Sequence, residues 1–185
     1  MTLAELRARL RAELGDQTVG AYVWSDELLD GFLGDAVERL GADSPLQREA
    51  QLSTAADGAY ALPADRLRLH EALLDDTPLH PAEYTVWAGK LRLQSPSPSE
   101  LLVRYAAARG RPPATGDVGL RAGEDPPVIW LAASYAMEWL SKQREKTGSA
   151  LAATSGTVAQ AYEQRYETWL ATKPRPLRRT VMSNG

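Results

Sequence analysis

The sequence predicts an α+β protein, mostly α, with helix pairs at both ends around a small antiparallel β insert, and an extended C-terminal arm. Three observations support this prediction. Apolar residues recur with the helical period near both ends of the 185-residue chain, they alternate with polar residues in the middle, and the last residues combine prolines with cations. A chain of this length is expected to form one domain, here 1–171, followed by an arm over 172–185.

The first helix is predicted over about 2–14. Thr2 and Glu5 have the spacing of a capping box, in which each side chain accepts a hydrogen bond from the other residue's amide. Gly15 follows as a stop signal. Leu3, Leu6, Leu10 and Leu14 fall on one face, and Arg7, Arg9 and Arg11 are expected on the polar face.

The second helix is predicted over about 25–40. Ser25 is a suitable N-cap, and the acids Asp26 and Glu27 suit the positive end of the helix dipole. Gly41 is expected to end this helix, and Trp24 precedes its cap. The apolar stripe consists of Leu28, Leu29, Phe32, Leu33, Ala36, Val37 and Leu40.

A β-rich insert is predicted over about 47–105. Alternation of polar and apolar residues over 66–70 and 90–94 is typical of half-buried strands. The segment 84–87 is β-branched and aromatic, and Ala88-Gly89 suits a tight turn into the next strand. A further strand is expected over 101–105. Prolines keep these runs short.

A Gly- and Pro-rich loop is predicted over 106–124, unusually long for a compact domain, so that either flexibility or an outside partner is expected there. A third helix is predicted over about 126–147, with Asp125 as its cap. The last helix is predicted over about 157–171 with Thr157 as its cap, and the helicity of 149–156 stays open. Tyr135 and Trp139 have the spacing of residues that pack on one helix face.

Composition excludes several classes of function. The net charge of −3 argues against a general nucleic-acid binder, and the lack of cysteine excludes disulfides and thiolate metal sites. No apolar run is long enough to span a membrane, and the N-terminus does not resemble a signal peptide. The protein is therefore expected to be made and used without secretion.

The residues offer no chemistry of an enzyme. His70 and His80 could hold a metal only together with Asp75 or Asp76, and no ligand spacing supports such a site. Adjacent carboxylates point apart in a strand. No nucleophile elbow or phosphate loop is present. We therefore expect no catalytic site, no cofactor and no metal.

The end of the chain is the predicted functional segment. Prolines favour an extended backbone there, four cations occur without an acid, and apolar residues are interspersed. A segment too short to form its own core is expected to lie on another molecule or to remain in solvent. The candidate docking residues are Lys173, Pro174, Arg175, Pro176, Leu177, Arg178, Arg179, Val181 and Met182.

Two segments carry a resemblance to a known family. Trp24-Ser25-Asp26-Glu27-Leu28-Leu29 leads into the second helix, and Tyr60-Ala61-Leu62-Pro63-Ala64-Asp65 is the other segment. The second segment lies within the β insert, ahead of the strand predicted from residue 66, and is similar to a Tyr-x-Leu-Pro-x-Asp pattern that precedes the β segment of a known family. Together with the order of the elements the two segments resemble that family, the head-to-tail connector, or adaptor, proteins of tailed bacteriophages and gene transfer agents. In the second segment we expect Tyr60 and Leu62 to be buried on one side and Asp65 to accept backbone amides.

The resemblance implies a structural protein of the virion neck, assembled in the host cytoplasm. Twelve copies would form a ring beneath the portal protein, extend the DNA channel without binding DNA specifically, and contact the next connector or tail protein. The C-terminal arm would dock on the portal. The alternatives are a head-closure or tail-completion protein, which would contain more β structure, or a small bacterial α+β binding module or enzyme.

Overall fold

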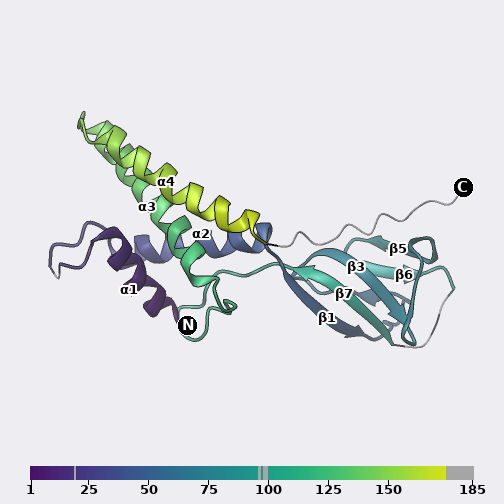
Figure 1. Cartoon of the computed structure of the whole chain (residues 1–185). Coiled ribbons are helices and arrows are strands. Elements are labelled where there is room, and N and C mark those ends of the chain that lie inside the picture. The colour runs from purple at the N-terminus through teal and green to yellow at the C-terminus, as the bar shows by residue number, and fades with distance from the viewer. Residues whose placement is uncertain (19, 96, 98–99, 174–185) are drawn as a thin grey trace, which may run out of the picture. The chain divides into compact units, whose positions relative to one another are not determined.

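A computed structural model describes residues 1–18, 20–95, 97 and 100–173 (Figure 1). The predicted α+β class is confirmed, with 44% helix and 22% strand among the described residues. The chain divides into two compact units: Met1–Ala36 with Pro112–Gly185, which we call the helical unit, and Val37–Arg111, which we call the β unit. The helix α2 (Asp26–Asp43) contributes residues to both.

Helix α1 (Leu3–Leu14) begins with the predicted capping box. The Thr2 hydroxyl oxygen accepts from the Glu5 amide at 3.2 Å, and the Glu5 carboxylate accepts from the Thr2 amide at 2.7 Å. Gly15 ends the helix in the left-handed conformation. Leu3, Leu6 and Leu10 are buried as expected.

Helix α2 begins where Ser25 accepts a hydrogen bond from the Leu28 amide at 3.3 Å, but its predicted end is wrong. Gly41 lies inside the helix, which continues to Asp43. A Cβ atom at Gly41 would stand 2.9 Å from both the Cβ and the backbone nitrogen of Arg109. The glycine therefore permits close approach of the chain, and it does not stop the helix.

Two glycines of α2 should respond in opposite ways to alanine. Gly31→Ala should raise the free energy of unfolding by about 0.5–1 kcal/mol, because nothing lies within 4 Å of the added methyl group. Gly41→Ala should lower it by about 1–3 kcal/mol, because the backbone of Arg109 has to move. Urea unfolding measures both. A stabilising Gly41→Ala would contradict the close approach.

Helices α3 (Asp125–Lys146) and α4 (Ala152–Ala171) form an antiparallel hairpin (Figure 1). Most of 149–156 is helical, yet the two helices do not merge, because the chain turns at Gly148 with φ +66°. The last helix starts at Ala152, and Thr157 is not its cap; its hydroxyl donates to the Ala153 carbonyl instead. The N-cap of α3 is Glu124, one residue before the predicted Asp125.

Small residues bring α3 and α4 together. Ser141 Oγ donates to the Ala152 carbonyl at 2.9 Å, and a Cβ at Gly156 would meet Ser141 Oγ at 3.5 Å. Ala159 is also buried, and Tyr166 is fully buried farther along α4. Tyr135 and Trp139, whose spacing predicts packing on one helix face, are both half-buried.

The β unit contains two antiparallel sheets. The larger has the order β1-β7-β3-β4, and the smaller has the order β2-β6-β5. A 3₁₀ turn, Pro81–Glu83, precedes β5. The strands are β1 (Leu46–Leu52), β2 (Tyr60–Ala61), β3 (Arg66–Leu74), β4 (Thr77–Pro78), β5 (Tyr84–Trp87), β6 (Lys90–Leu93) and β7 (Leu101–Ala107).

The core of the β unit is built mainly from β7 and the residues that face it, including Leu52, Leu91 and Leu101. The predicted alternation over 66–70 is only partly realised: Leu67 is 53% exposed. Register shifts on both sides of this stretch of β3 explain the difference, because each shift turns the following side chains to the other face.

The motif over 60–65 folds largely as expected. Tyr60 and Leu62 are buried, and the Tyr60 hydroxyl donates to the Ser97 carbonyl at 3.0 Å. The Asp65 side chain accepts from the Arg48 guanidinium at 2.6 Å. Its partner is thus an arginine of β1 where backbone amides were expected.

The long loop is shorter than predicted, because Ala106 and Ala107 belong to β7. Part of it is ordered by the N-terminal segment: the Val118 amide donates to the Met1 carbonyl at 2.9 Å, and Thr2 pairs with Asp117 as a β-bridge. Part of the loop is therefore ordered by contacts with the same chain.

Candidate assembly surfaces

The predicted docking arm begins at the end of α4. Of its nine candidate residues the structure describes only Lys173, whose amide donates to the Leu170 carbonyl at 3.1 Å. The Lys173 ammonium lies 4.3 Å from the centre of the Trp169 ring, a cation–π contact. The other eight residues, from Pro174 to Met182, lie outside the described residues.

Charge separates the arm from the rest of the chain. Residues 174–185 hold three arginines and no acid. The whole chain has 21 Lys and Arg against 24 Asp and Glu, so the remaining residues carry a net charge of −6. An arm of this charge is repelled by cationic surfaces and attracted by acidic ones.

A buried arginine organises the connection between α1 and α2. Arg11 was expected on the polar face of its helix, but only 9% of it is exposed. Its guanidinium pairs with Asp16, donates to the Trp24 carbonyl at 3.1 Å and to Asp26 at 2.7 Å, and lies 3.9 Å from the centre of the Tyr22 ring. The Arg11 side chain thus contacts three residues of the loop and the first residue of α2. It is buried because the loop folds over it.

The carboxylates around Arg11 differ in environment. The other oxygen of Asp16 accepts from the Val23 amide at 2.8 Å. The hydrogen bond from Arg11 lowers the pKa of Asp26, which also pairs with Arg7 at 2.7 Å. Burial raises the pKa of Asp30, although Arg7 lies 3.4 Å away. The acids of the early α2 segment are therefore largely engaged in fixing the helical unit.

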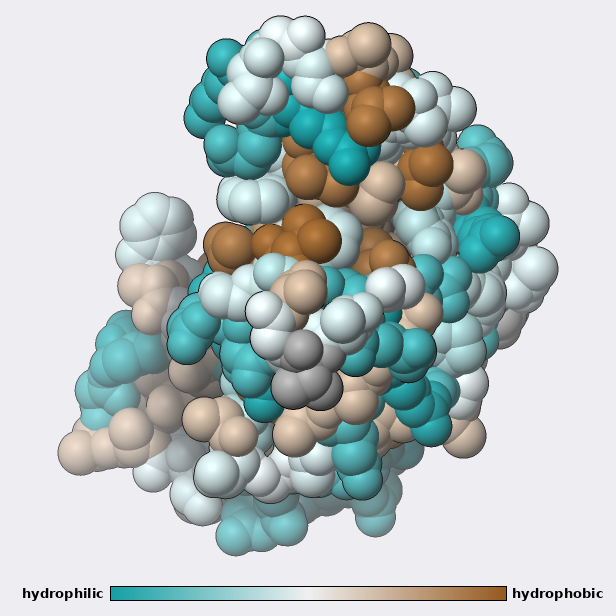
Figure 2. All heavy atoms as spheres, turned by 90° about the vertical axis from the view of Figure 1, so that its left-hand side faces the viewer, coloured by the Kyte–Doolittle hydropathy of each residue, from teal (hydrophilic) through white to brown (hydrophobic). Residues whose placement is uncertain are grey.

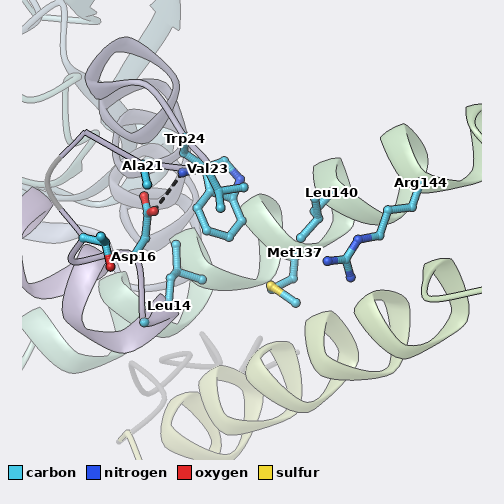
Figure 3. A pocket seen from close by; sticks show the side chains of 10 residues that line it. Leu14, Asp16, Ala21, Val23, Trp24, Met137, Leu140 and Arg144 are labelled. Atoms are coloured by element: carbon cyan, nitrogen blue, oxygen red, sulfur yellow. Dashed lines mark hydrogen bonds between the residues drawn. The ribbon is translucent and has the colours of Figure 1, made fainter. Parts of the chain in front are cut away.

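A hollow of about 330 Å³ lies between this loop and α3 within the helical unit. Figure 2 shows apolar side chains gathered in a depression on this face of the molecule. In Figure 3, side chains of the α1–α2 connection stand opposite side chains of α3. Its lining includes Asp16 beside Leu14, Val23, Trp24, Met137, Leu140 and Arg144.

Two hydrogen-bond donors belong to side chains that line the hollow. Trp24 is 3% exposed, and its buried Nε1 has no hydrogen-bond partner among the described residues. Arg144 donates to the Ser155 hydroxyl at 2.5 Å, and no carboxylate in the described ranges pairs with it. Because no carboxylate among the described residues balances the charge of Arg144, the hollow suits a partner that carries a negative charge.

Two hairpin tips project from the β unit. Trp87, 83% exposed, precedes the turn of Ala88 and Gly89, both with positive φ, as the sequence predicted for this turn. The turn between β3 and β4 consists of Asp75 and Asp76, with φ of 49° and 61°. Exposed tips of this kind are typical of contact sites on other proteins.

The histidines lie apart from these surfaces. His70 is exposed on β3 as expected, and partial burial, with a smaller contribution from Arg68, lowers its pKa. His80 Nδ1 accepts from the Ala82 amide at 3.2 Å and so caps the 3₁₀ turn. In the part of the chain that the structure describes, no three His, Asp or Glu side chains are grouped as metal ligands would be. Nor does any described helix have the length and apolar character to span a bilayer.

Sequence reasoning missed three features: the buried Arg11, the hollow and the exposed tip at Trp87. The Ala88-Gly89 turn signal could have revealed the tip, since a residue beside a tight hairpin turn has few neighbours. No local signal separates Arg11 from Arg7 and Arg9, because its burial depends on the loop that follows.

Exposed hairpin tips and an apolar hollow are features of proteins that act by contact with other proteins. The family comparison agrees: residues 1–183 match the family model of the SU10 adaptor protein. The chain belongs to this family, a family of phage head-to-tail adaptors, and is thus a structural component of a bacteriophage particle. No curated protein matches the chain.

Proposed function

We propose that this adaptor forms a ring beneath the portal protein in the virion neck, extends the DNA channel and joins the capsid to the tail. The ring contains further copies of the chain, twelve by family resemblance, and offers its far side to the next connector or tail protein. The family match over 1–183 carries this proposal, because membership of an adaptor family implies contact with other phage structural proteins.

The arm is the proposed portal contact. It follows directly on Lys173 at the end of α4, and twelve residues reach at most about 40–43 Å when extended, enough to cross onto a second protein. Fixing twelve backbone units costs roughly 12–24 kcal/mol. Apolar burial of roughly 500–1,000 Å² offsets this, less the contribution of hydrogen bonds and ion pairs. A ring multiplies each contact by its copy number.

The charge distribution supports the same arrangement. A body of net charge −6 repels the phosphate backbone, so DNA can move along the channel without release of condensed counterions at each step. The cationic segment is confined to the arm, which in this proposal lies against protein.

Truncation after Lys173 should abolish capture by portal rings while leaving the fold intact. Lys173 is kept because it packs on Trp169 and completes the end of α4. Pull-down on immobilised portal measures binding, and circular dichroism with thermal unfolding checks the fold.

The matched control removes three cations from the folded body by the substitutions Arg68→Gln, Arg121→Gln and Lys146→Gln, all at exposed positions. This variant should bind the portal as the wild type does. Capture of the truncated protein at full strength would overturn the proposed role of the arm.

A further inference from the structure

We propose that the hollow of the helical unit receives the Asp75–Asp76 hairpin tip of a neighbouring copy. The proposal deepens the proposed function, because it names a contact between copies in the ring and rests on that ring. The sites belong to different units of the chain, so the contact runs from the β unit of one copy to the helical unit of the next.

The lining of the hollow favours a partner that carries a negative charge. Its walls are the apolar side chains of Leu14, Val23, Met137 and Leu140. Its polar lining includes the guanidinium of Arg144, which donates to the Ser155 hydroxyl and has no carboxylate partner among the described residues, and Asp16, which pairs with Arg11. A carboxylate would give Arg144 a charge-assisted hydrogen bond, which is the stronger kind.

The hairpin tip presents acceptors and negative charge. Leu74 pairs with Thr77, so Asp75 and Asp76 alone form the two-residue turn. Both are exposed, and no described side chain pairs with either. Positive φ at both positions matches the mirror-image turn that two-residue hairpins favour, which holds the two carboxylates in a fixed place. Pro78, also exposed, adds an apolar surface beside them.

Charge distinguishes this tip from the other occupants that the chain offers. The tip at Trp87 carries Lys90 and Arg92, which share the single carboxylate of Asp57 and would meet Arg144 with like charge. The C-terminal arm holds three arginines and would be repelled in the same way. Of these three segments only the 75–76 turn is acidic.

The arrangement also fits closure of a ring. The hollow and the tip are different patches, so the contact between copies is heterologous. Each copy offers its tip to one neighbour and its hollow to the other, and the same contact repeats from copy to copy until the rotation closes. A self-complementary patch would stop at a dimer.

Disulfide trapping tests the contact without any portal, because the chain contains no cysteine of its own. One copy carries Asp76→Cys and the other carries Leu140→Cys. Mixing them at high concentration under mild oxidation should give a disulfide-linked heterodimer, provided that the two Cα atoms approach within about 7 Å. Non-reducing electrophoresis and intact mass measure the yield.

Charge exchange gives the deciding comparison. Adding Arg144→Glu to the Leu140→Cys copy should lower the yield about tenfold, because like charges then face each other. Adding Asp75→Arg to the Asp76→Cys copy should restore the yield of heterodimer with the Leu140→Cys copy that carries Arg144→Glu. The same addition should lower the yield with the Leu140→Cys copy that keeps Arg144. Circular dichroism and thermal unfolding verify that each variant folds.

Ala161→Cys, at an exposed position on α4 that does not line the hollow, replaces Leu140→Cys as the control and should give little heterodimer. A yield equal to this control, or one unaffected by Arg144→Glu, would overturn the contact. The portal pull-down tests the proposed function separately. A negative result there can therefore be distinguished from a negative result in the disulfide trapping.

Discussion

Arg11→Ala should lower the free energy of unfolding by about 3–5 kcal/mol, because it leaves the carboxylate of Asp16 buried without its counter-charge. The Asp16 side chain is 2% exposed and that of Arg11 11% exposed. The substitution also removes the hydrogen bond to the Trp24 carbonyl and the contact with the Tyr22 ring. The loop between α1 and α2 then loses the side chain that joins its two ends.

Arg9→Ala is the matched control from the same helix. Its guanidinium pairs with Asp125 but is 55% exposed, so the change should cost less than about 1 kcal/mol. Urea unfolding followed by tryptophan fluorescence measures both variants. A double-mutant cycle with Asp16→Asn isolates the pair, and a coupling energy near zero would contradict the buried ion pair.

Tyr166→Ala should destabilise the protein by about 3–5 kcal/mol, the cost of removing a buried aromatic ring and leaving a cavity. Tyr166 is fully buried in α4, and its ring centre lies 6.2 Å from that of Trp169. Tyr166→Phe is the conservative control, because it keeps the ring and removes only the hydroxyl. Thermal unfolding of the two variants separates the contribution of packing from that of the hydroxyl.

Trp139→Ala provides the contrast on the facing helix. A fully buried Trp139 would cost as much as Tyr166, but the side chain is only half-buried, so about 1–2 kcal/mol is expected. Equal losses for Tyr166→Ala and Trp139→Ala would place both rings in the core, in disagreement with the structure.

The sequence alone determined the features that depend on neighbouring residues. The capping box of Thr2 and Glu5, the stop at Gly15 and the turn at Ala88-Gly89 all appear as predicted. Each is set within four residues of chain by the hydrogen bonds or the dihedral angles that these side chains favour. The net charges of the acidic body and of the basic arm also follow from the sequence, because they depend only on the residues that each part contains.

Only the tertiary structure decided the features that depend on residues distant in the chain. Gly41 lies inside a helix at the point where Arg109 approaches closely, and Arg11 is buried because the loop to α2 closes over it. The hollow likewise exists only where that loop faces α3. A close approach, an ion pair or a cavity forms between two segments that are distant in the sequence. Its free energy therefore cannot be inferred from the residues of either segment alone.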